Sequence, residues 1–382
     1  MPYKNVVILK SNLSSCGGIE KYTLRTAQAF VEKGCKVTLL TSGDKTPATS
    51  EGIEVISLCK PKPLSVYNIW DFDRTCQKWL KQNPADVIFG MDRNTYQTHY
   101  RAGDGVHAAY LKRRSKDVSF LKKATFSINP LHKLVLNIEQ QAYEDDNLRC
   151  LFTNSEMVRK EVLEHYKIKE NKVSTVHNGV EWYEMQSDFD QWESKHKPNR
   201  NSLSLDPHAF QFLFIGNGFR RKGLHLFLKG LSQQLNENWQ LSVVGKDKET
   251  LKFQNLARTL GIAEKVKFFG PQENTIKFYQ QADSLVIPSI YDPFANVTVE
   301  ALAMGLFVIS SKGNGGHEVL LPKNGVVIEE LMNRNSVEES IKHALKHKKT
   351  KESADFIRNS VKNLDFAFQL GKIVQKTLNT LQ

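Results

Sequence analysis

Short apolar runs alternate with amphipathic stretches along the first half of the chain. Lys4–Lys10 is a compact apolar run that predicts a strand, and Ile19–Lys33 carries apolar residues at helical spacing. Gly34 ends that helix, and Lys36–Thr41 predicts the next strand. A strand, a helix and a second strand in this order indicate a parallel sheet. Further strands are predicted at Gly52–Leu58, Asp86–Phe89, Arg149–Thr153 and Val173–Val176.

The same alternation begins again after residue 207. Strands are predicted at Gln211–Ile215, Gln240–Val244, Lys265–Phe268, Ser284–Ile287 and Phe307–Ser310. Helices are predicted at Lys222–Leu235, Leu251–Leu260, Thr275–Gln281, around Thr298–Met304, and through the region from Ser336 to Leu381. Two α/β halves of this kind predict two Rossmann-like doubly wound domains, with a ligand cleft near the carboxyl ends of both sheets.

These patterns divide the chain into four parts. Residues 1–185 form an N-terminal domain and residues 208–364 a C-terminal domain. Residues 186–207 are predicted to be a linker, because the polar stretch Glu181–Pro207 shows no sustained period. Residues 365–382 are predicted to form a C-terminal helix that packs back on the N-terminal domain.

The composition fits a folded globular protein, with 25% charged and 40% hydrophobic residues among 382. No stretch approaches the roughly 20 apolar residues of a membrane-spanning helix, and the start lacks the features of a signal peptide. We therefore expect a cytoplasmic chain that can still bind to a membrane face. Five scattered cysteines argue against a disulfide framework and a zinc site. The net charge of +12 favours nucleic acid, anionic lipid or a phosphorylated ligand as partner, without choosing among them.

Two glycine-containing turns are candidates for binding phosphate. Gly17 and Gly18 stand between the first strand and the first helix, where backbone N–H groups can approach an anion. They match neither G-x-G-x-x-G nor a Walker A loop, so a plain turn is an alternative. Gly216–Gly223 (GNGFRRKG) follows the first strand of the second half. There Arg221 and Lys222 suit a diphosphate, and a solvated basic turn is the alternative.

Two carboxylates stand eight positions apart in the stretch that ends at Gly305. Asp292 is in a loop bent by Pro293, and Glu300 is on the helix that follows. That helix begins near Phe294, Ala295, Asn296 and Val297, where N–H groups can hold a phosphate. The loop carboxylate can face a sugar while Glu300 accepts hydrogen bonds from a ribose diol. Taken alone, Glu300 fits an ordinary helix glutamate equally well.

In this order the motifs resemble those of the retaining GT-B glycosyltransferases of family 4. GGIEKYTLRTAQAFVEKGCKVTLLT and FLFIGNGFRRKGLHLFLKGL are similar to that family's opening β-α-β unit and phosphate-binding turn. Val173–Val180 (VSTVHNGV) is similar to its inter-domain segment, and Lys312–Leu320 (KGNGGHEVL) to its Gly-Gly-x-x-Glu segment. The resemblance covers nearly the whole chain and is strongest toward members that build the lipopolysaccharide core.

The resemblance implies an α/β GT-B fold, in which an N-terminal acceptor-side domain and a C-terminal donor domain face a central cleft. It implies transfer of a hexose, with glucose as a candidate, from a nucleotide-sugar donor, with UDP as the expected nucleotide. The acceptor that the resemblance implies is a lipid-linked or surface glycan such as lipopolysaccharide core. Arg221 and Lys222 then bind the diphosphate, Glu300 the ribose, and Asp292 lies near the donor sugar. The donor-binding set is Gly17, Gly18, Gly216, Arg221, Lys222, Phe294, Ala295, Asn296, Val297 and Glu300.

The chain departs from the family pattern at two positions. Asp292 stands where the family usually has Glu, and Ala295 stands where Gly is common. The shorter carboxylate is expected to alter donor choice or reduce activity. The candidate catalytic residues are Asp292 with Asp104 or His107, because the resemblance places an acceptor-side acid or histidine at GDGVH. A structural histidine is the alternative for His107.

No metal and no cofactor are expected beyond the nucleotide-sugar co-substrate. The triplets Asp71–Asp73 and Asp188–Asp190 do not follow a strand, as the D-x-D motif of the other major glycosyltransferase fold does. Retention in the family is usually explained by front-face attack that the leaving phosphate assists. The alternatives are a nucleotide-sugar epimerase of the same fold, a weakly active sugar-nucleotide-binding protein, and a Rossmann dehydrogenase, which the missing G-x-G-x-x-G disfavours.

A basic cluster interleaved with apolar residues predicts docking at an anionic membrane surface. The cations assigned to the membrane are Lys112, Arg113, Arg114, Lys116, Lys122 and Lys123. A solvated basic face is the alternative. Nucleic acid is not expected as a partner, because no nucleic-acid-binding module is recognisable.

Overall fold

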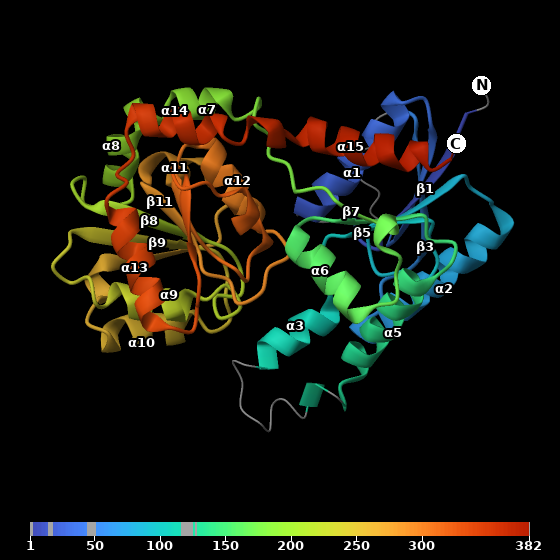
Figure 1. The fold of residues 1–382 in the computed structure, drawn as a ribbon, viewed down its shortest axis with the longest axis horizontal. Helices are drawn as coiled ribbons and strands as arrows, with labels where there is room; N and C mark the ends of the chain where they lie inside the picture. The colour runs from blue at the N-terminus through green and yellow to red at the C-terminus, as the bar shows by residue number, and fades with distance from the viewer. Residues whose placement is uncertain (1–2, 14–17, 44–50, 116–124, 127, 382) are drawn as a thin grey trace. The chain divides into compact units, whose positions relative to one another are not determined.

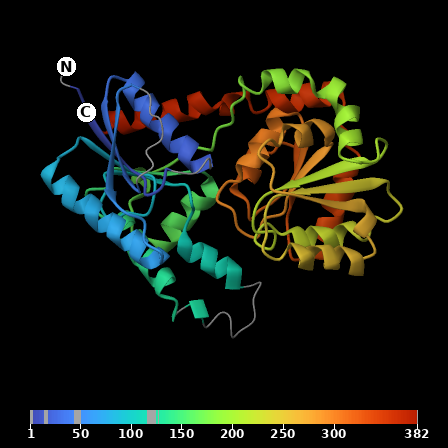
Figure 2. The ribbon, with the colours of Figure 1, turned by 180° about the vertical axis from the view of Figure 1, so that it is seen from behind.

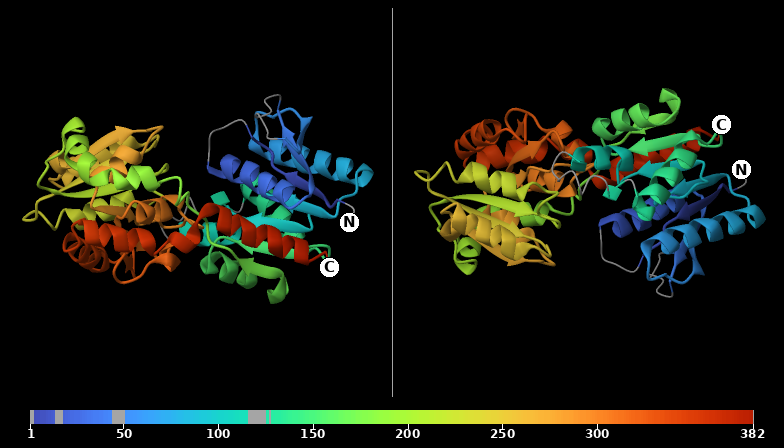
Figure 3. Two further views of the ribbon diagram at one scale, coloured as in Figure 1. Left: turned by 90° about the horizontal axis from the view of Figure 1, so that it is seen from above. Right: turned by 90° about the horizontal axis from the view of Figure 1, so that it is seen from below.

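The structure is a computed structural model that describes residues 3–13, 18–43, 51–115, 125, 126 and 128–381. The chain forms two compact units, one made of Met1–His177 with Ala367–Gln382 and the other of Asn178–Phe366 (Figure 1). Helices cover both faces of the sheet in each unit, as the views from behind and from above and below also show (Figure 2, Figure 3).

Among the described residues, the first unit contains a seven-stranded parallel sheet in the order β3-β2-β1-β4-β5-β6-β7. Its strands are β1 (Asn5–Leu9), β2 (Lys36–Ser42), β3 (Ile53–Cys59), β4 (Val87–Gly90), β5 (His99–Ala102), β6 (Cys150–Thr153) and β7 (Val173–Thr175). Its helices are α1 (Gly18–Glu32), α2 (Ser65–Gln82), α3 (His107–Arg114), α5 (Pro130–Glu144), α6 (Glu156–His165), η2 (Glu170–Lys172) and α15 (Phe366–Asn379). The central strand β1 pairs in register with β2 and β4, Val6 lying beside Val37 and Val87.

Among the described residues, the second unit contains a six-stranded parallel sheet in the order β10-β9-β8-β11-β12-β13. Its strands are β8 (Phe210–Ile215), β9 (Trp239–Val244), β10 (Val266–Gly270), β11 (Ser284–Ile287), β12 (Phe307–Ser311) and β13 (Gly325–Ile328). Its longer helices are α7 (Gln186–Asp190), α8 (Trp192–Ser202), α9 (Leu224–Leu231), α10 (Thr250–Thr259), α11 (Ile276–Gln281), α12 (Asn296–Ala303), α13 (Arg334–Leu345) and α14 (Lys351–Asn359). Its short 3₁₀ turns are η3 (Ala263–Lys265), η4 (Gly315–Val319) and η5 (Lys362–Leu364).

In each sheet, successive strands are added first on one side of the first strand and then on its other side. This reversal of side confirms the predicted doubly wound α/β architecture. The reversal falls between β1 and β4 in the first unit and between β8 and β11 in the second. Loops that leave neighbouring strands at such a point diverge, and ligands of open α/β sheets bind there. In the second unit, Phe212, Phe214 and Trp239 are fully buried and fix the strands beneath this point.

Residues 186–207, predicted to be a linker, are instead part of the second unit. They fold into α7 and α8, and the unit boundary lies earlier, between His177 and Asn178. The polar composition of this segment suggested a solvent-exposed linker, but one of its cations, Arg200, is buried. Arg200 is fully buried and pairs with the equally buried Asp283 at 2.8 Å, and it also donates to the backbone carbonyls of Gln281 and Ala209. A buried cation with all these partners holds α8 against the sheet.

The region from Ser336 to Leu381 is helical, as predicted, and contains most of α13 together with α14 and α15, separated by short turns. Thr350 begins α14 with a capping box, which explains the break. Helix α14 of the tail lies beside α7 of the same unit (Figure 1, Figure 2). The last segment, Ala367–Gln382, belongs to the first unit, where Lys376 donates to Ser174 at 2.8 Å.

Candidate active site

The turn after β8 presents two cations at the reversal point of the second sheet. Gly223 has φ +75°, and a Cβ there would lie 1.8 Å from the carbonyl oxygen of Pro288, so only glycine fits before α9. Phe219 is 1% exposed and packs edge-on against Phe214 and Phe253. This buried anchor fixes the turn that carries the exposed Arg221 and the buried Lys222.

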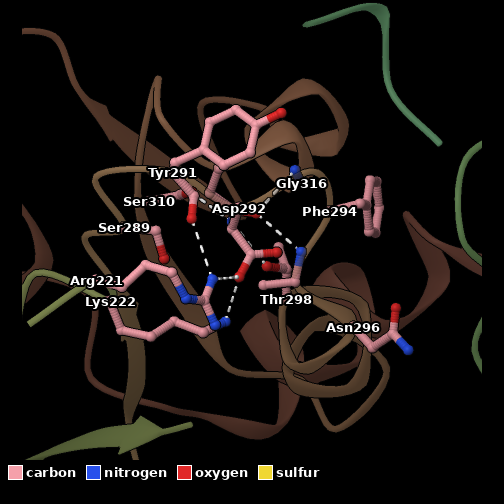
Figure 4. A network of polar contacts seen from close by, with 12 residues as sticks. Arg221, Lys222, Ser289, Tyr291, Asp292, Phe294, Asn296, Thr298, Ser310 and Gly316 are labelled. Carbon is pink, nitrogen blue, oxygen red and sulfur yellow. Dashed lines mark hydrogen bonds and ion pairs between the residues drawn. The ribbon is translucent and has the colours of Figure 1, made fainter. Parts of the chain in front are cut away.

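Asp292 binds both of these cations (Figure 4). Its Oδ2 atom lies 2.5 Å from Nζ of Lys222 and 3.1 Å from Nη1 of Arg221. The Lys222 and Asp292 side chains are 9% and 10% exposed, whereas Arg221 is 41% exposed. Burial alone would raise the pKa of Asp292, but the charges of Lys222 and Arg221 outweigh it and hold the pKa below its usual value. The three groups carry one net positive charge.

A buried amide holds the Asp292 loop in place. Asn314 is fully buried, and its Oδ1 atom accepts from the backbone N–H groups of Ala295 and Gly316 at 2.9 and 3.1 Å. Its Nδ2 atom donates to Thr298 and to Ser310. Asn314 therefore joins the loop after β11, the start of α12 and the loop after β12. Sequence analysis did not single out this residue, although it lies within the Gly-Gly segment.

Helix α12 starts directly after the Asp292 loop. Phe294 and Ala295 are buried, Asn296 is exposed and Val297 is half-buried. In the described part of the chain, no side-chain cap is found at Ala295. The first N–H groups of a helix lack intrahelical partners and suit an anion such as phosphate. Asn178, from the Asn-Gly-Val segment, donates to Asn296 at 2.6 Å and so ties that segment to the helix start.

Glu300 lies one turn further along α12. It is half-buried, and its Oε2 atom accepts from the hydroxyl of Tyr279 at 2.7 Å. Tyr279 is 1% exposed, and burial raises its pKa well above the usual value, so it stays a hydrogen-bond donor. Tyr279 was not predicted, because its helical pattern gave no sign of a polar role. The contact fixes the orientation of the carboxylate.

The first unit places Asp104 and His107 after β5. The Asp104 side chain is 46% exposed, and its Oδ2 atom lies 3.1 Å from Nη1 of Arg93. Arg93 also pairs with the buried Glu139 at 3.0 Å, and Glu139 accepts from the backbone N–H of His107 at 2.9 Å. The Arg93–Glu139 pair thus links both candidate residues. Neither member of this pair was predicted.

The imidazole of His107 is neutral near pH 7. Its Nε2 atom lies 3.0 Å from Nδ1 of His132. Burial, together with the charges of Arg93 and His132, lowers its pKa to about 4. A neutral imidazole can accept a proton, whereas Asp104 offers a solvent-exposed carboxylate.

The remaining predicted residues either lie outside the described residues or make few contacts that bear on function. Gly17, Lys116, Lys122 and Lys123 lie outside the described residues, and Gly18 is the first residue of α1. Gly216 follows β8, with the Lys222 stem packed across it. The triplet Asp71–Asp73 is inside α2 and Asp188–Asp190 ends α7. Within the described ranges, no group of three His, Cys, Asp or Glu side chains is placed to hold a metal ion.

The described part of the predicted membrane cluster lies on α3 and is partly engaged within the fold. Lys112 pairs with Glu164 at 2.8 Å and Arg113 with Glu161 at 2.7 Å, both on α6. Arg114 lies over the ring of Tyr110. In the part of the chain that the structure describes, no helix has the length and apolar character needed to cross a bilayer.

Known proteins match both halves of the chain. Residues 16–181 match the model Glycosyltransferase Family 4, and residues 195–363 match Glycosyl transferases group 1. The crystal structure of WaaG, a glycosyltransferase involved in lipopolysaccharide biosynthesis, superposes with a TM-score of 0.78 over 97% of this chain and 99% of WaaG. The chain belongs to the GT-B glycosyltransferases. At 21% identity, that superposition itself concerns the fold alone.

Two further comparisons describe relatives of this glycosyltransferase. The lipopolysaccharide glucosyltransferase WaaG of Escherichia coli is 24% identical over 338 residues, covering 86% of each chain. HepE of Anabaena, solved in complex with UDP-glucose, is 15% identical with a TM-score of 0.68 over 99% of this chain and all of its own. The resemblance that the motifs indicated is therefore confirmed at the level of family and fold.

Proposed function

We propose that this glycosyltransferase moves a hexose from a UDP-linked donor to a hydroxyl of a lipid-linked or surface glycan such as lipopolysaccharide core. Glucose is the candidate hexose, and the anomeric configuration is retained. The Escherichia coli relative is named a lipopolysaccharide glucosyltransferase, and the Anabaena structure holds UDP-glucose. These are properties of those proteins, and they support the choice of donor and acceptor for this chain.

The contact of Asp292 with Lys222 and Arg221 carries the proposal. Two cations meet at the carboxyl edge of the sheet, and α12 begins directly after the same loop. This arrangement suits a group whose negative charge grows as it leaves. In transfer, the bond from the anomeric carbon to the diphosphate oxygen breaks, and the acceptor oxygen bonds to that carbon. The acceptor proton goes to the departing phosphate oxygen, and the cations stabilise the charge that remains.

Each polar residue of the second unit then has a distinct task. Lys222 and Arg221 bind the diphosphate, and Asp292 holds the buried Lys222 side chain in place. Glu300, oriented by Tyr279, accepts hydrogen bonds from the ribose diol. The shorter Asp292, which stands where Glu is usual, leaves room for the donor sugar. We propose that no metal is needed, because the two cations supply the charge compensation.

In the first unit, Asp104 and His107 serve the acceptor. Asp104 is exposed enough to accept a hydrogen bond from an acceptor hydroxyl, and Arg93 holds it in place. The neutral imidazole of His107 offers a second acceptor at the same edge of the sheet. The proposal includes work at the cytoplasmic face of an anionic membrane, which the net charge of +12 favours.

The proposal is tested with a panel of nucleotide sugars and crude glycolipid acceptors. Mass spectrometry should show a hexose added to the acceptor only with a UDP-linked donor, and NMR should show the donor's anomeric configuration in the product. Transfer should continue in a chelator. A sugar product formed without acceptor would indicate an epimerase instead. Tight donor binding without turnover would indicate a binding protein, and either outcome would overturn the proposal.

A further inference from the structure

Helix α2 carries one stripe of exposed residues along its outer side. Its buried side is formed by Phe72, Asp73, Cys76 and Leu80. On the opposite side, residues three or four positions apart line up because a helix has about 3.6 residues per turn. These exposed residues are Tyr67, Trp70, Arg74, Lys78 and Lys81. With Leu64 just before the helix, they form what we call the α2 stripe.

The stripe is apolar at its start and cationic toward its end. Leu64, Tyr67 and Trp70 are 63%, 60% and 47% exposed, which is unusual for side chains of this size. The guanidinium of Arg74 lies 5.2 Å from the ring centre of Trp70, at the junction of the two parts.

The charge of this surface is one-sided. Asp71, beside the stripe, is paired with Lys62 at 3.4 Å. Asp73 points inward and accepts from the backbone N–H of Thr95 at 2.7 Å. Among the described residues, no carboxylate lies within ion-pair distance of the three cations of the stripe. By contrast, Lys112 and Arg113 of α3 already have acidic partners on α6.

We propose that the α2 stripe docks this enzyme on an anionic lipid bilayer. Tryptophan and tyrosine favour the interface between headgroups and acyl chains, where one part of the ring is apolar and another is wet. Arginine and lysine then reach the anionic headgroups while their stems cover apolar surface. The inference rests on the proposed lipid-linked acceptor, and it names the surface that holds the enzyme on the membrane.

Vesicle flotation of the full chain tests the docking surface. Wild type should float with vesicles that contain about one quarter phosphatidylglycerol and stay behind with pure phosphatidylcholine. Changing Tyr67→Ser with Trp70→Ser, or Arg74→Glu with Lys78→Glu, should each weaken binding about tenfold or more. The matched controls are Tyr183→Ser and Lys342→Glu with Lys346→Glu, at exposed positions of the second unit. These controls should bind as wild type does.

Trp70 also provides a direct probe. It is exposed, whereas Trp79 is half-buried against the core and Trp182, Trp192 and Trp239 are buried. Brominated lipids should quench part of the wild-type fluorescence, and Trp70→Phe should remove that quenching. Wild-type binding in the α2 variants, no binding of wild type to anionic vesicles, or Trp70-dependent self-association in place of vesicle binding would overturn the inference. Transfer to a detergent-solubilised acceptor should survive in the α2 variants. Loss of transfer in wild type with docking intact would refute the proposed function alone.

Discussion

The ammonium group of Lys222 lies 2.5 Å from the carboxylate of Asp292, and both side chains are about nine-tenths buried. The two residues come from loops after different strands, β8 and β11, which are neighbours in the sheet. In the proposed function these two cations bind the donor diphosphate, so the internal carboxylate competes with the donor for them. On that proposal, the pair affects both stability and donor affinity.

Asp292→Asn should strengthen UDP binding while it weakens the unliganded protein. Removing the carboxylate raises the net charge around Lys222 and Arg221, so UDP should bind about fivefold tighter, or roughly 1 kcal/mol. The thermal midpoint without UDP should fall, because a buried ammonium loses its partner. Calorimetric titration with UDP measures the affinity, and Asp292→Glu, which keeps the charge, is the control. Weaker UDP binding by Asp292→Asn would contradict the account.

The same carboxylate predicts a pH dependence. The folded-state pKa of Asp292 is lowered from 3.8, so its contribution to stability is present above that pH. This contribution is lost as the pH falls through the lower folded-state pKa. The free energy of unfolding, measured in urea, should therefore fall more steeply below about pH 4 for wild type than for Asp292→Asn. Parallel curves for the two proteins would show that the pair contributes nothing.

Tyr279→Phe should reduce donor use without removing the fold. The substitution deletes only the hydroxyl that donates to Glu300 at 2.7 Å. We expect kcat/KM for the UDP-sugar to fall about three- to tenfold, the size of one hydrogen bond. The exposed Tyr183→Phe is the control and should leave kinetics unchanged. If kcat/KM of Tyr279→Phe equals that of wild type, the orientation of Glu300 by Tyr279 does not contribute to donor use.

Glu139→Gln should destabilise the first unit. Glu139 is 1% exposed and neutralises Arg93, whose side chain is 19% exposed. Without this carboxylate, Arg93 keeps Asp104 as its partner, so the free energy of unfolding should fall by about 2–3 kcal/mol. Urea unfolding measures the change. Glu164→Gln removes a surface pair with Lys112 and should leave the unfolding curve almost unchanged. Equal changes in the free energy of unfolding for both variants would mean that the buried pair stabilises the fold no more than the surface pair does.

His107 predicts a second pH dependence, with the sign set by its lowered pKa. The unfolded chain binds the proton near pH 6.5, whereas the folded protein binds it near pH 4. The contribution of His107 to stability is therefore fully present above pH 6.5 and is lost as the pH falls toward 4. Between pH 6.5 and 5, the free energy of unfolding of His107→Gln should fall by about 1 kcal/mol less than that of wild type, allowing for partial exposure. Identical losses in urea unfolding would place the histidine in solvent.

Most strands could be predicted because each buried strand is a dense apolar run, as in Val6–Leu9, whereas the helices α2, α3, α5 and α6 were not assigned. Strand β5 was missed because HYRA carries a histidine and an arginine that the fold buries, and the apolar GVVI of β13 was also missed. The linker prediction failed because Arg200 is buried against Asp283, a partner far along the chain. Composition gives no sign of such a pair.

The candidate site was predicted in its parts but not in its contacts. Lys222 and Asp292 were both selected, yet one was assigned to the diphosphate and the other to the sugar. Their mutual ion pair depends on β8 and β11 lying side by side, which the motifs do not state. Tyr279 supports the site through one hydrogen bond and Asn314 through four, and neither position stands out in the sequence. Only the folded sheet brings such residues to the motif that they orient.

The most direct test of the central claim is the rate of hexose transfer from a UDP-linked donor by Lys222→Ala. Lys229→Ala, at an exposed position of α9, is the matched control. If Lys222 stabilises the departing diphosphate, its loss should lower kcat/KM by about 100-fold or more, whereas Lys229→Ala should transfer at the wild-type rate. A Lys222→Ala enzyme that folds, binds UDP and transfers within about threefold of wild type would contradict the account.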